Sequence, residues 1–173
     1  MEINADSIGE IFDKVRILYP DAVIAGGCMR DFLLKKKIKD IDIYTRCFSN
    51  ELYSRRLSDV GFVLLNPKDD NENYLSSDTM VKKYKYKDIP VDIIHISSGA
   101  YKTTVEYIDK TFDYGICKVF FDGLKVIKLL EFIEDEKNKT ITLLSDSKAE
   151  QTRVIEHYKR IKAKYPDYEG RIK

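Results

Sequence analysis

The stretch that decides the fold of this chain covers residues 22–44 and reads Ala22-Val23-Ile24-Ala25-Gly26-Gly27-Cys28-Met29-Arg30-Asp31-Phe32-Leu33-Leu34-Lys35-Lys36-Lys37-Ile38-Lys39-Asp40-Ile41-Asp42-Ile43-Tyr44. Its apolar beginning predicts a strand that ends at a glycine pair, and the glycine pair opens a helix. A basic turn follows, and a second strand then carries two carboxylates one residue apart. This order of parts suits a site that holds a triphosphate beside a divalent metal.

The two carboxylates of the second strand are Asp40 and Asp42. Side chains two positions apart on a strand point to the same face of a sheet, so these two are expected to project together. Carboxylates at that spacing repel each other unless a cation lies between them. Such oxygen ligands suit Mg²⁺, which commonly takes one or two carboxylates together with substrate phosphates.

The glycine pair supplies the other half of the predicted site. Gly26 and Gly27 lack Cβ atoms, so backbone N–H groups can approach an anion closely. The helix that they open adds its positive N-terminal end. A Gly-Gly alone is usually a turn, and an Asp-x-Asp alone is usually solvated. Their combination in this order favours a functional site.

The composition agrees with a soluble enzyme domain of 173 residues, 43% of them hydrophobic. No apolar run approaches the length of a membrane span, and the N-terminus lacks the features of a signal peptide. Cys28, Cys47 and Cys117 are widely spaced, which predicts reduced thiols in a cytoplasmic protein. The net charge of +1 makes no argument for nucleic acid by itself.

The segments quoted above resemble the nucleotidyltransferase head of the DNA polymerase β superfamily. The closest resemblance is to CCA-adding tRNA nucleotidyltransferases and bacterial poly(A) polymerases, whose signature is matched position for position by Gly26-Gly27-Cys28-Met29-Arg30-Asp31-Phe32-Leu33 and Lys39-Asp40-Ile41-Asp42-Ile43. The resemblance implies an α/β (α+β) fold, with a mixed sheet flanked by helices. The head is expected over residues 1–128, and a helical, neck-like extension over residues 129–173.

Heads of this family use three acidic residues, the third on a neighbouring strand. Asp92 lies inside an otherwise apolar strand, where an unpaired carboxylate is costly. The resemblance implies that Asp92 shares a two-metal site for Mg²⁺, or Mn²⁺ in its place, with Asp40 and Asp42, and helps to deprotonate the attacking hydroxyl. The alternative is a buried aspartate satisfied by an arginine or lysine. His95 is assigned no role, and His157 is expected to be solvated.

The resemblance also implies which residues bind the nucleotide. Gly26, Gly27 and Arg30 would position the triphosphate, and Asp31 would orient Arg30 or cap the helix. The same resemblance carries over to two further segments and assigns nucleotide contacts to Asp113 and Arg153.

Both of those assignments rest on partial matches. The segment 110–117 resembles a family motif that contacts the nucleotide sugar, but Thr111, Phe112 and Cys117 replace its two arginines and its asparagine. Asp113 could instead shape a turn. Glu150 and Arg153 stand one helical turn apart, as does the pair that reads the base in the family. The alternative for them is a solvated amphipathic helix.

The remaining elements follow from periodicity. Ser7-Ile8-Gly9-Glu10 has the spacing of a capping box, and the apolar residues from Ile8 to Leu18 fall on one helical face. Ser49 is expected to cap another helix, and residues 67–78 to form a loop. Strands are expected at 22–26, 40–45, 62–65, 81–87, 89–96, 117–121 and 124–128, and helices at 28–36, 101–109, 129–137 and 146–164.

The expected strand 81–87 carries a row of cations. Its alternation puts Lys83, Lys85 and Lys87 on one face, next to the strand of Asp92. If the two strands pair, the row lies near the active cleft, and we assign it to binding of the acceptor. The alternative is a solvated edge, where lysines guard against aggregation.

The predicted reaction transfers a nucleoside monophosphate from an NTP, ATP or CTP, to an acceptor hydroxyl and releases pyrophosphate. The resemblance implies an RNA 3′ end as the acceptor. A second possibility is nucleotidylation of a protein or a small molecule. A third is an inactive head that serves as a binding module, and the intact Asp40, Asp42 and Asp92 argue against it.

Overall fold

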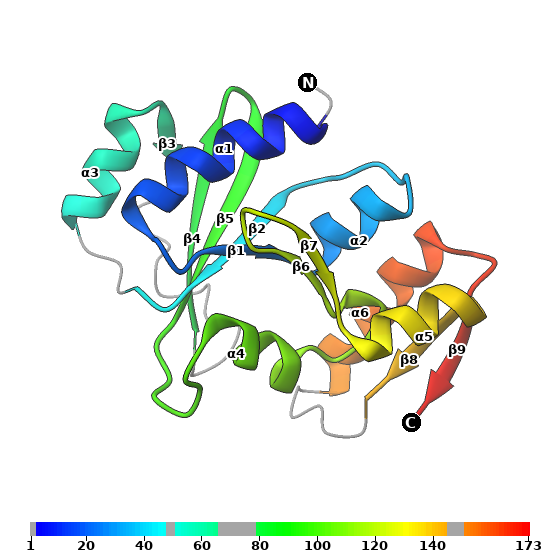
Figure 1. The fold of residues 1–173 in the computed structure, drawn as a ribbon. Coiled ribbons are helices and arrows are strands. Elements are labelled where there is room, and N and C mark those ends of the chain that lie inside the picture. Colours follow the sequence, from blue (N-terminus) through cyan, green and yellow to red (C-terminus); the bar gives the residue numbers. More distant parts are fainter. Residues whose placement is uncertain (1–2, 48–50, 66–78, 145–150) are drawn as a thin grey trace.

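The computed structural model describes residues 3–47, 51–65, 79–144 and 151–173. Its centre is a mixed seven-stranded sheet with the order β3-β4-β5-β2-β1-β6-β7, flanked by helices (Figure 1). The strands are β1 (Val23–Ala25), β2 (Ile41–Thr45), β3 (Phe62–Leu64), β4 (Thr79–Tyr86), β5 (Ile89–Ile96), β6 (Val119–Phe121) and β7 (Val126–Lys128). This architecture confirms the expected α/β head fold.

The helices are α1 (Ala5–Leu18), α2 (Gly27–Leu33), α3 (Glu51–Asp59), α4 (Thr104–Thr111), α5 (Leu130–Asn138) and α6 (Gln151–Lys164). A short 3-10 helix, η1 (Gly115–Cys117), connects α4 to β6. Two further strands, β8 (Thr140–Leu143) and β9 (Glu169–Ile172), form a separate parallel pair. The sequence analysis expected a helical extension after residue 128. The structure has helices there and also the strands β8 and β9. None of the described helices is long and apolar enough to cross a membrane.

The two faces of the sheet are covered differently. On one face, α1 packs Ile8, Ile11, Phe12 and Val15 into the main core, and the alternation in β2 sends Ile41 and Ile43 to the same core. On the other face, α4 contributes Tyr107 and Ile108 to a smaller cluster. Tyr44, which alternates with the two isoleucines in β2, packs against this smaller cluster, so the alternating side chains of β2 point to the α4 side. Figure 1 shows α1 and α4 on opposite sides of the sheet.

Helix α1 begins three residues earlier than its expected capping box. Asn4 is the N-cap, and its side chain accepts a hydrogen bond from the backbone N–H of Ser7 at 3.0 Å. The Ser7 hydroxyl in turn accepts one from the backbone N–H of Asn4 at 2.9 Å. Ser7 therefore completes a capping box instead of opening one, because the asparagine before it can cap as well as a serine.

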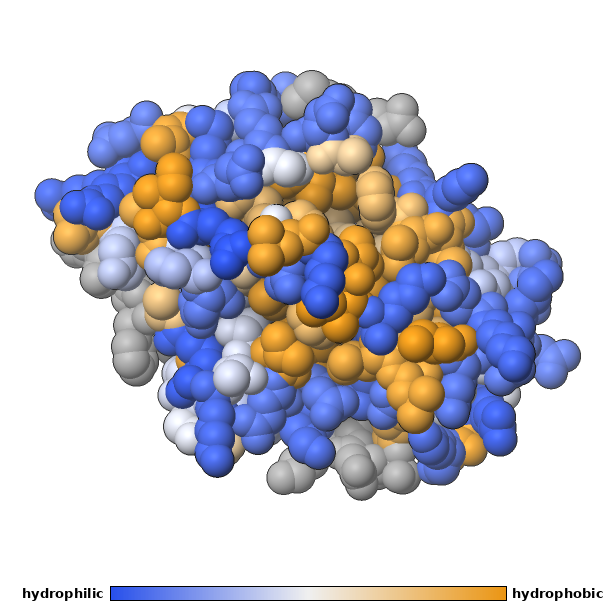
Figure 2. All heavy atoms as spheres, viewed as in Figure 1, coloured by the Kyte–Doolittle hydropathy of each residue, from blue (hydrophilic) through white to orange (hydrophobic). Residues whose placement is uncertain are grey.

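The expected hairpin around Asp122 and Gly123 is present as β6 and β7. Gly123 has a φ of +96°, which only glycine adopts without strain. Leu124 at its tip and Leu130 at the start of α5 are 90% and 64% exposed. Figure 2 shows apolar side chains gathered at the centre of this face of the molecule, over the hairpin and α5.

Three expectations concern residues outside the described ranges. They are the cap at Ser49, the loop at 67–78 and the position of Glu150.

Candidate active site

The three predicted carboxylates gather around the middle of the sheet. β2 and β5 run parallel, and their register places the Cα atoms of Asp42 and Asp92 opposite each other. Neighbouring partners on parallel strands project from the same face, which is here the α4 side. Asp40 immediately precedes β2, and all three residues are partly buried.

The electrostatics of the site disfavour its charged form. Burial, together with the charges of Asp40 and Asp92, raises the pKa of Asp42 to about 7. Burial also raises the pKa of Asp92; the charge of Lys83 opposes this shift and that of Asp40 adds to it. Carboxylates that resist ionisation in this way gain most from a cation.

The donor set suits Mg²⁺, but its geometry is not yet assembled. Among the described residues, no three Asp, Glu, His or Cys side chains stand close enough together to hold a metal ion. Oxygen donors and mutual repulsion at Asp40, Asp42 and Asp92 fit a hard divalent cation.

Two of the three predicted acceptor lysines lie on the carboxylate face. β4 pairs with β5 so that Lys83 is opposite Asp92 and Lys85 is opposite Pro90. Both lysines are exposed, whereas Tyr84 is buried on the other face. The charge of Lys83 acts to lower the pKa of Asp92, although burial still leaves that pKa raised.

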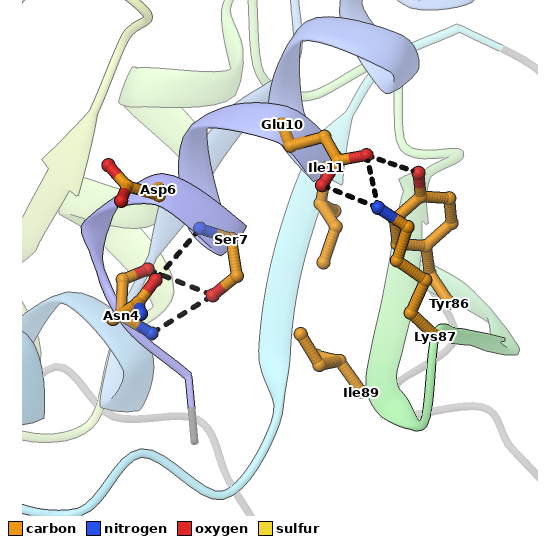
Figure 3. Close-up of a pocket in the computed structure, with 8 residues that line it drawn as sticks. All are labelled: Asn4, Asp6, Ser7, Glu10, Ile11, Tyr86, Lys87 and Ile89. Carbon is orange, nitrogen blue, oxygen red and sulfur yellow. Dashed lines mark hydrogen bonds and ion pairs between the residues drawn. The ribbon is translucent and has the colours of Figure 1, made fainter. Parts of the chain in front are cut away.

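Lys87 does not continue this row, contrary to the expectation from alternation. It lies beyond β4 in a turn where Lys87 and Asp88 both have positive φ, as in the two-residue hairpin turns that match strand twist. Its Nζ donates to Glu10 at 2.8 Å and 3.0 Å, as does the hydroxyl of Tyr86 at 2.6 Å (Figure 3). These residues line a small hollow of about 220 Å³ against α1.

The two glycines differ in what they require. Gly26 is the N-cap of α2 with a φ of +73°, and a Cβ there would meet Phe112 at 3.3 Å. The backbone at Gly26 thus demands glycine. Gly27 begins α2, and its Cβ would meet only the Nη2 atom of Arg30 at 3.7 Å, an ordinary contact. The fold therefore tolerates a small side chain at Gly27.

Arg30 is buried and contacted by neighbouring side chains, and its contact with the triphosphate stays a prediction. It is only 4% exposed, and its Nε donates to Asp31 at 2.7 Å. Its Nη1 donates to the thiol of Cys117 at 3.2 Å, and its guanidinium lies over the ring of Tyr165. The guanidinium of Arg30 is therefore enclosed by neighbouring side chains, including that of Tyr165, which follows α6.

The predicted nucleotide residues Asp113 and Arg153 contact each other. Nη2 of Arg153, on α6, lies 3.1 Å from Oδ2 of the buried Asp113. The side chain of Arg153 remains 43% exposed, so it can also reach a ligand. His157, one turn along α6, places its Nδ1 3.9 Å from the same carboxylate.

His157 is the residue that the sequence analysis missed. Its side chain is 29% exposed and packs edge-on against the ring of Tyr114, so it is not simply solvated. Burial alone would lower the pKa of His157, but the nearby carboxylate of Asp113 and the thiol of Cys117 raise it to about 9. The resulting positive charge acts on Asp42. Its spacing of four residues from Arg153 was the available signal.

Cys117 joins this network from η1. Burial alone would raise the pKa of its thiol, but the charge of Arg30 and a hydrogen bond with His157 lower it. His95, by contrast, is a packed histidine whose Nδ1 lies 2.8 Å from the carbonyl oxygen of Cys47. Burial lowers the pKa of His95 to about 4.

Comparisons with known proteins place the fold. The family model for "Gad2: Gabija anti-defense 2 family protein" matches residues 3–139. A comparison with curated proteins finds no match.

Several solved structures share the architecture. A tRNA-processing enzyme superposes with a TM-score of 0.70 at 17% identity, covering 98% of this chain and 45% of that one. The Thermotoga maritima CCA-adding enzyme complexed with tRNA gives 0.62 at 18%, covering 99% and 40%. The Bacillus stearothermophilus CCA-adding enzyme in complex with CTP gives 0.56 at 16%, covering 83% and 34%. This chain therefore spans less than half the length of each, and at these identities the likeness establishes the fold.

Proposed function

The chain belongs to the Gabija anti-defense 2 (Gad2) family, and from this family and its fold we propose that it is a metal-dependent nucleotidyltransferase. It would transfer a nucleoside monophosphate from an NTP to an acceptor hydroxyl and release pyrophosphate. The observation that supports this function best is the register that sets Asp42 beside Asp92, with Asp40 next to them, in a fold shared with CCA-adding enzymes.

In this proposal Asp40, Asp42 and Asp92 hold two Mg²⁺ ions, or Mn²⁺ in their place. When bound, such ions activate the attacking hydroxyl and neutralise charge on the leaving group. Asp92 accepts the proton of the acceptor hydroxyl, a role suited to a carboxylate whose pKa is raised by burial. Asp42 must be ionised to take part, so activity should rise with pH through about 7.

The nucleotide, ATP or CTP, would lie between the start of α2 and α6. We propose that the backbone of Gly26 and Gly27 faces the phosphates, and that Asp113 and Arg153 contact the base or sugar. Arg30 supports this arrangement from beneath by holding Asp31 and Cys117 in place. His157 adds a positive charge beside Asp42.

The acceptor that we propose is an RNA 3′ end. Lys83 and Lys85 lie on the carboxylate face and are exposed, as phosphate-binding lysines must be. Among structures with this fold, one CCA-adding enzyme was solved with tRNA. Protein or small-molecule acceptors, and an inactive binding module, are the alternatives that the experiment below separates.

We propose residues 1–128 as the catalytic head and residues 129–173 as the extension that supplies α6. A cytoplasmic location is also part of the proposal, and the three free cysteines suit it.

The test is incubation with labelled ATP or CTP and Mg²⁺, together with either RNA or a protein extract. We expect label on RNA and release of pyrophosphate with the wild-type protein, and neither with Asp42→Asn. Asp13→Asn, which changes an exposed aspartate on α1, is the matched control and should remain active. Label on protein alone would show that the acceptor is a protein and not RNA. No transfer to any acceptor would favour an inactive binding module.

A further inference from the structure

A second hollow, of about 500 Å³, has no role in the reaction described above. It is bounded by the basic turn before β2, the turn between β4 and β5, and the end of α6. Ile38, Ile89 and Pro90 form an apolar floor, and Lys37, Lys39 and Lys164 line its rim. A volume of this order is typical of sites that hold small organic groups, about 300–1,000 Å³.

The hollow lies at the N-terminal ends of the parallel strands β2 and β5, with Ile38 and Ile89 on the α1 side and Lys39 and Pro90 nearer the carboxylates. Lys39 precedes Asp40, and its Nζ lies 3.9 Å from an oxygen of that carboxylate. Pro90 stands two residues before Asp92 on β5, and so points to the same face of the sheet. A chain lying in the hollow would therefore end near the three carboxylates.

The rim is positively charged. The side chain of Lys39 is 81% exposed, and Lys37 is exposed as well. Lys164 has a different role, because its ammonium donates to Asp31 and to the carbonyl oxygen of Lys37 at 3.2 Å. It fixes the basic turn in place and leaves Lys37 and Lys39 to face a ligand.

The acidic group at the hollow is already neutralised. Asp88 lines it, but its carboxylate lies 2.6 Å from Nζ of Lys85. Lys85 belongs to the row that begins at Lys83, opposite Asp92. Lys83 on β4 and Lys37 and Lys39 at the rim are therefore the cations near this end of the sheet that Asp88 does not pair.

We propose that this hollow binds the single-stranded RNA acceptor just before its 3′ end, with a base and sugar on the apolar floor and phosphates at Lys37 and Lys39. The proposal rests on the proposed function in taking RNA as the acceptor. Nucleotides present apolar ring faces and phosphates at close intervals. Single-strand sites combine a basic groove with a platform for the bases, which is commonly aromatic and here is aliphatic. An acidic peptide would match the cations but would leave the floor uncovered.

The test measures binding of a short fluorescein-labelled poly(A) RNA by anisotropy over a salt series. Phosphate contacts to single strands each contribute about −0.7 to the slope of log affinity against log salt. Lys37→Ala/Lys39→Ala should therefore flatten the slope by about 1.4 and weaken binding at low salt. Lys37→Arg/Lys39→Arg should preserve both the slope and the affinity.

The matched control is Lys125→Ala/Lys137→Ala, which removes the same charge from exposed lysines on the β7 side of the sheet. It should leave the slope unchanged, and thermal melting should show that each variant is folded. A wild-type slope in Lys37→Ala/Lys39→Ala would overturn the proposal, as would no RNA binding by the wild-type protein at low salt.

The two proposals can fail separately. RNA that binds through Lys37 and Lys39 but receives no label from ATP or CTP would refute the transferase function and leave the RNA site standing. RNA that is labelled equally well by Lys37→Ala/Lys39→Ala would refute the site and leave the function standing.

Discussion

Asp42 is the residue at which the conflict between stability and function is clearest. Its pKa of about 7, raised by burial and by Asp40 and Asp92, means that the folded protein favours its neutral form. When the pKa of a carboxyl group is higher in the folded state than in the unfolded state, ionising that group lowers the free energy of unfolding. The free energy of unfolding therefore falls as pH rises from about 4 to 7 through this group.

Asp42→Asn should stabilise the metal-free protein at pH 8. It removes a charge that burial opposes, and we expect a gain of roughly 1–3 kcal/mol in the free energy of unfolding, because each pKa unit corresponds to about 1.4 kcal/mol. Urea denaturation at pH 8 in a chelating buffer measures it, with Asp13→Asn as the control. A variant less stable than the wild-type protein would show that Asp42 is already satisfied in the fold.

Gly27 offers the cleanest separation of binding from folding. Gly27→Ala places a Cβ in ordinary contact with Arg30, so the melting temperature should hold while affinity for ATP or CTP falls. Gly26→Ala should instead lose about 1–3 kcal/mol of stability, because φ of +73° with ψ of −132° at Gly26 is a conformation that other residues rarely adopt. Calorimetric titration beside thermal melting measures both. Wild-type nucleotide affinity in Gly27→Ala would reduce the glycine pair to a turn.

Among the elements, α6 does most to shape the site. Two buried aspartates of the head, Asp113 and Asp31, contact α6 and Tyr165, the residue after α6. Asp113 contacts Arg153 and His157, and Asp31 accepts hydrogen bonds from Lys164 and from Tyr165, the latter at 2.8 Å. These contacts position His157 beside Asp42 and cover Arg30.

The contact between His157 and Asp113 should make stability depend on pH. Because the folded pKa of His157 is about 9 and the unfolded value is about 6.5, its contribution is complete below pH 6.5 and is lost as pH rises through 9. The stability difference between wild type and His157→Gln should therefore shrink over that window. Denaturation at several pH values measures it, with Lys159→Gln on the same helix as the control. A difference that stays constant from pH 6 to 10 would contradict the charged histidine.

The anchor of α6 at Asp31 should be worth far more than a surface ion pair. Asp31→Ala leaves the buried Arg30 without its carboxylate, and we expect a loss of about 3–5 kcal/mol. Asp88→Ala breaks an exposed pair with Lys85 and should change the free energy of unfolding little. Urea denaturation compares the two variants directly. Similar losses would mean that Arg30 finds another partner.

At the scale of the whole molecule, positive and negative charges nearly cancel, but lysines cluster in one region. The formal net charge is +1, yet Lys83, Lys85, Lys37 and Lys39 flank one group of carboxylates. Their attraction for phosphates and the carboxylates' need for a cation together concentrate binding at one place on the surface.

Mg²⁺ should therefore stabilise the protein as a whole. A ligand that binds only the folded state raises the free energy of unfolding by RT ln(1 + [L]/Kd), so the melting temperature should rise with Mg²⁺ or Mn²⁺. The rise should be largest above pH 7, where Asp42 is ionised, and should disappear in Asp42→Asn. Removal of the metal with a chelator should reverse it. An equal rise in Asp42→Asn would place the ion elsewhere.

The sequence by itself determined the fold and the grouping of the carboxylates. Local rules suffice for both: a glycine pair ends one strand, alternation points Asp42 to a face, and an apolar run around Asp92 makes a central strand. Such patterns act over a few residues, and a mixed sheet can place those strands side by side.

Tertiary structure alone decided which charged groups remain free to act. Asp31 orients Arg30, as expected, but it also binds Lys164 and Tyr165, which lie more than 130 residues away in the chain. His157 lies next to the buried Asp113, and Lys87 forms an ion pair with Glu10. Both partners are distant in the chain. The hollow at Lys37 and Lys39 also depends on where α6 ends. Local periodicity carries no information on such contacts, because they depend on how distant elements pack.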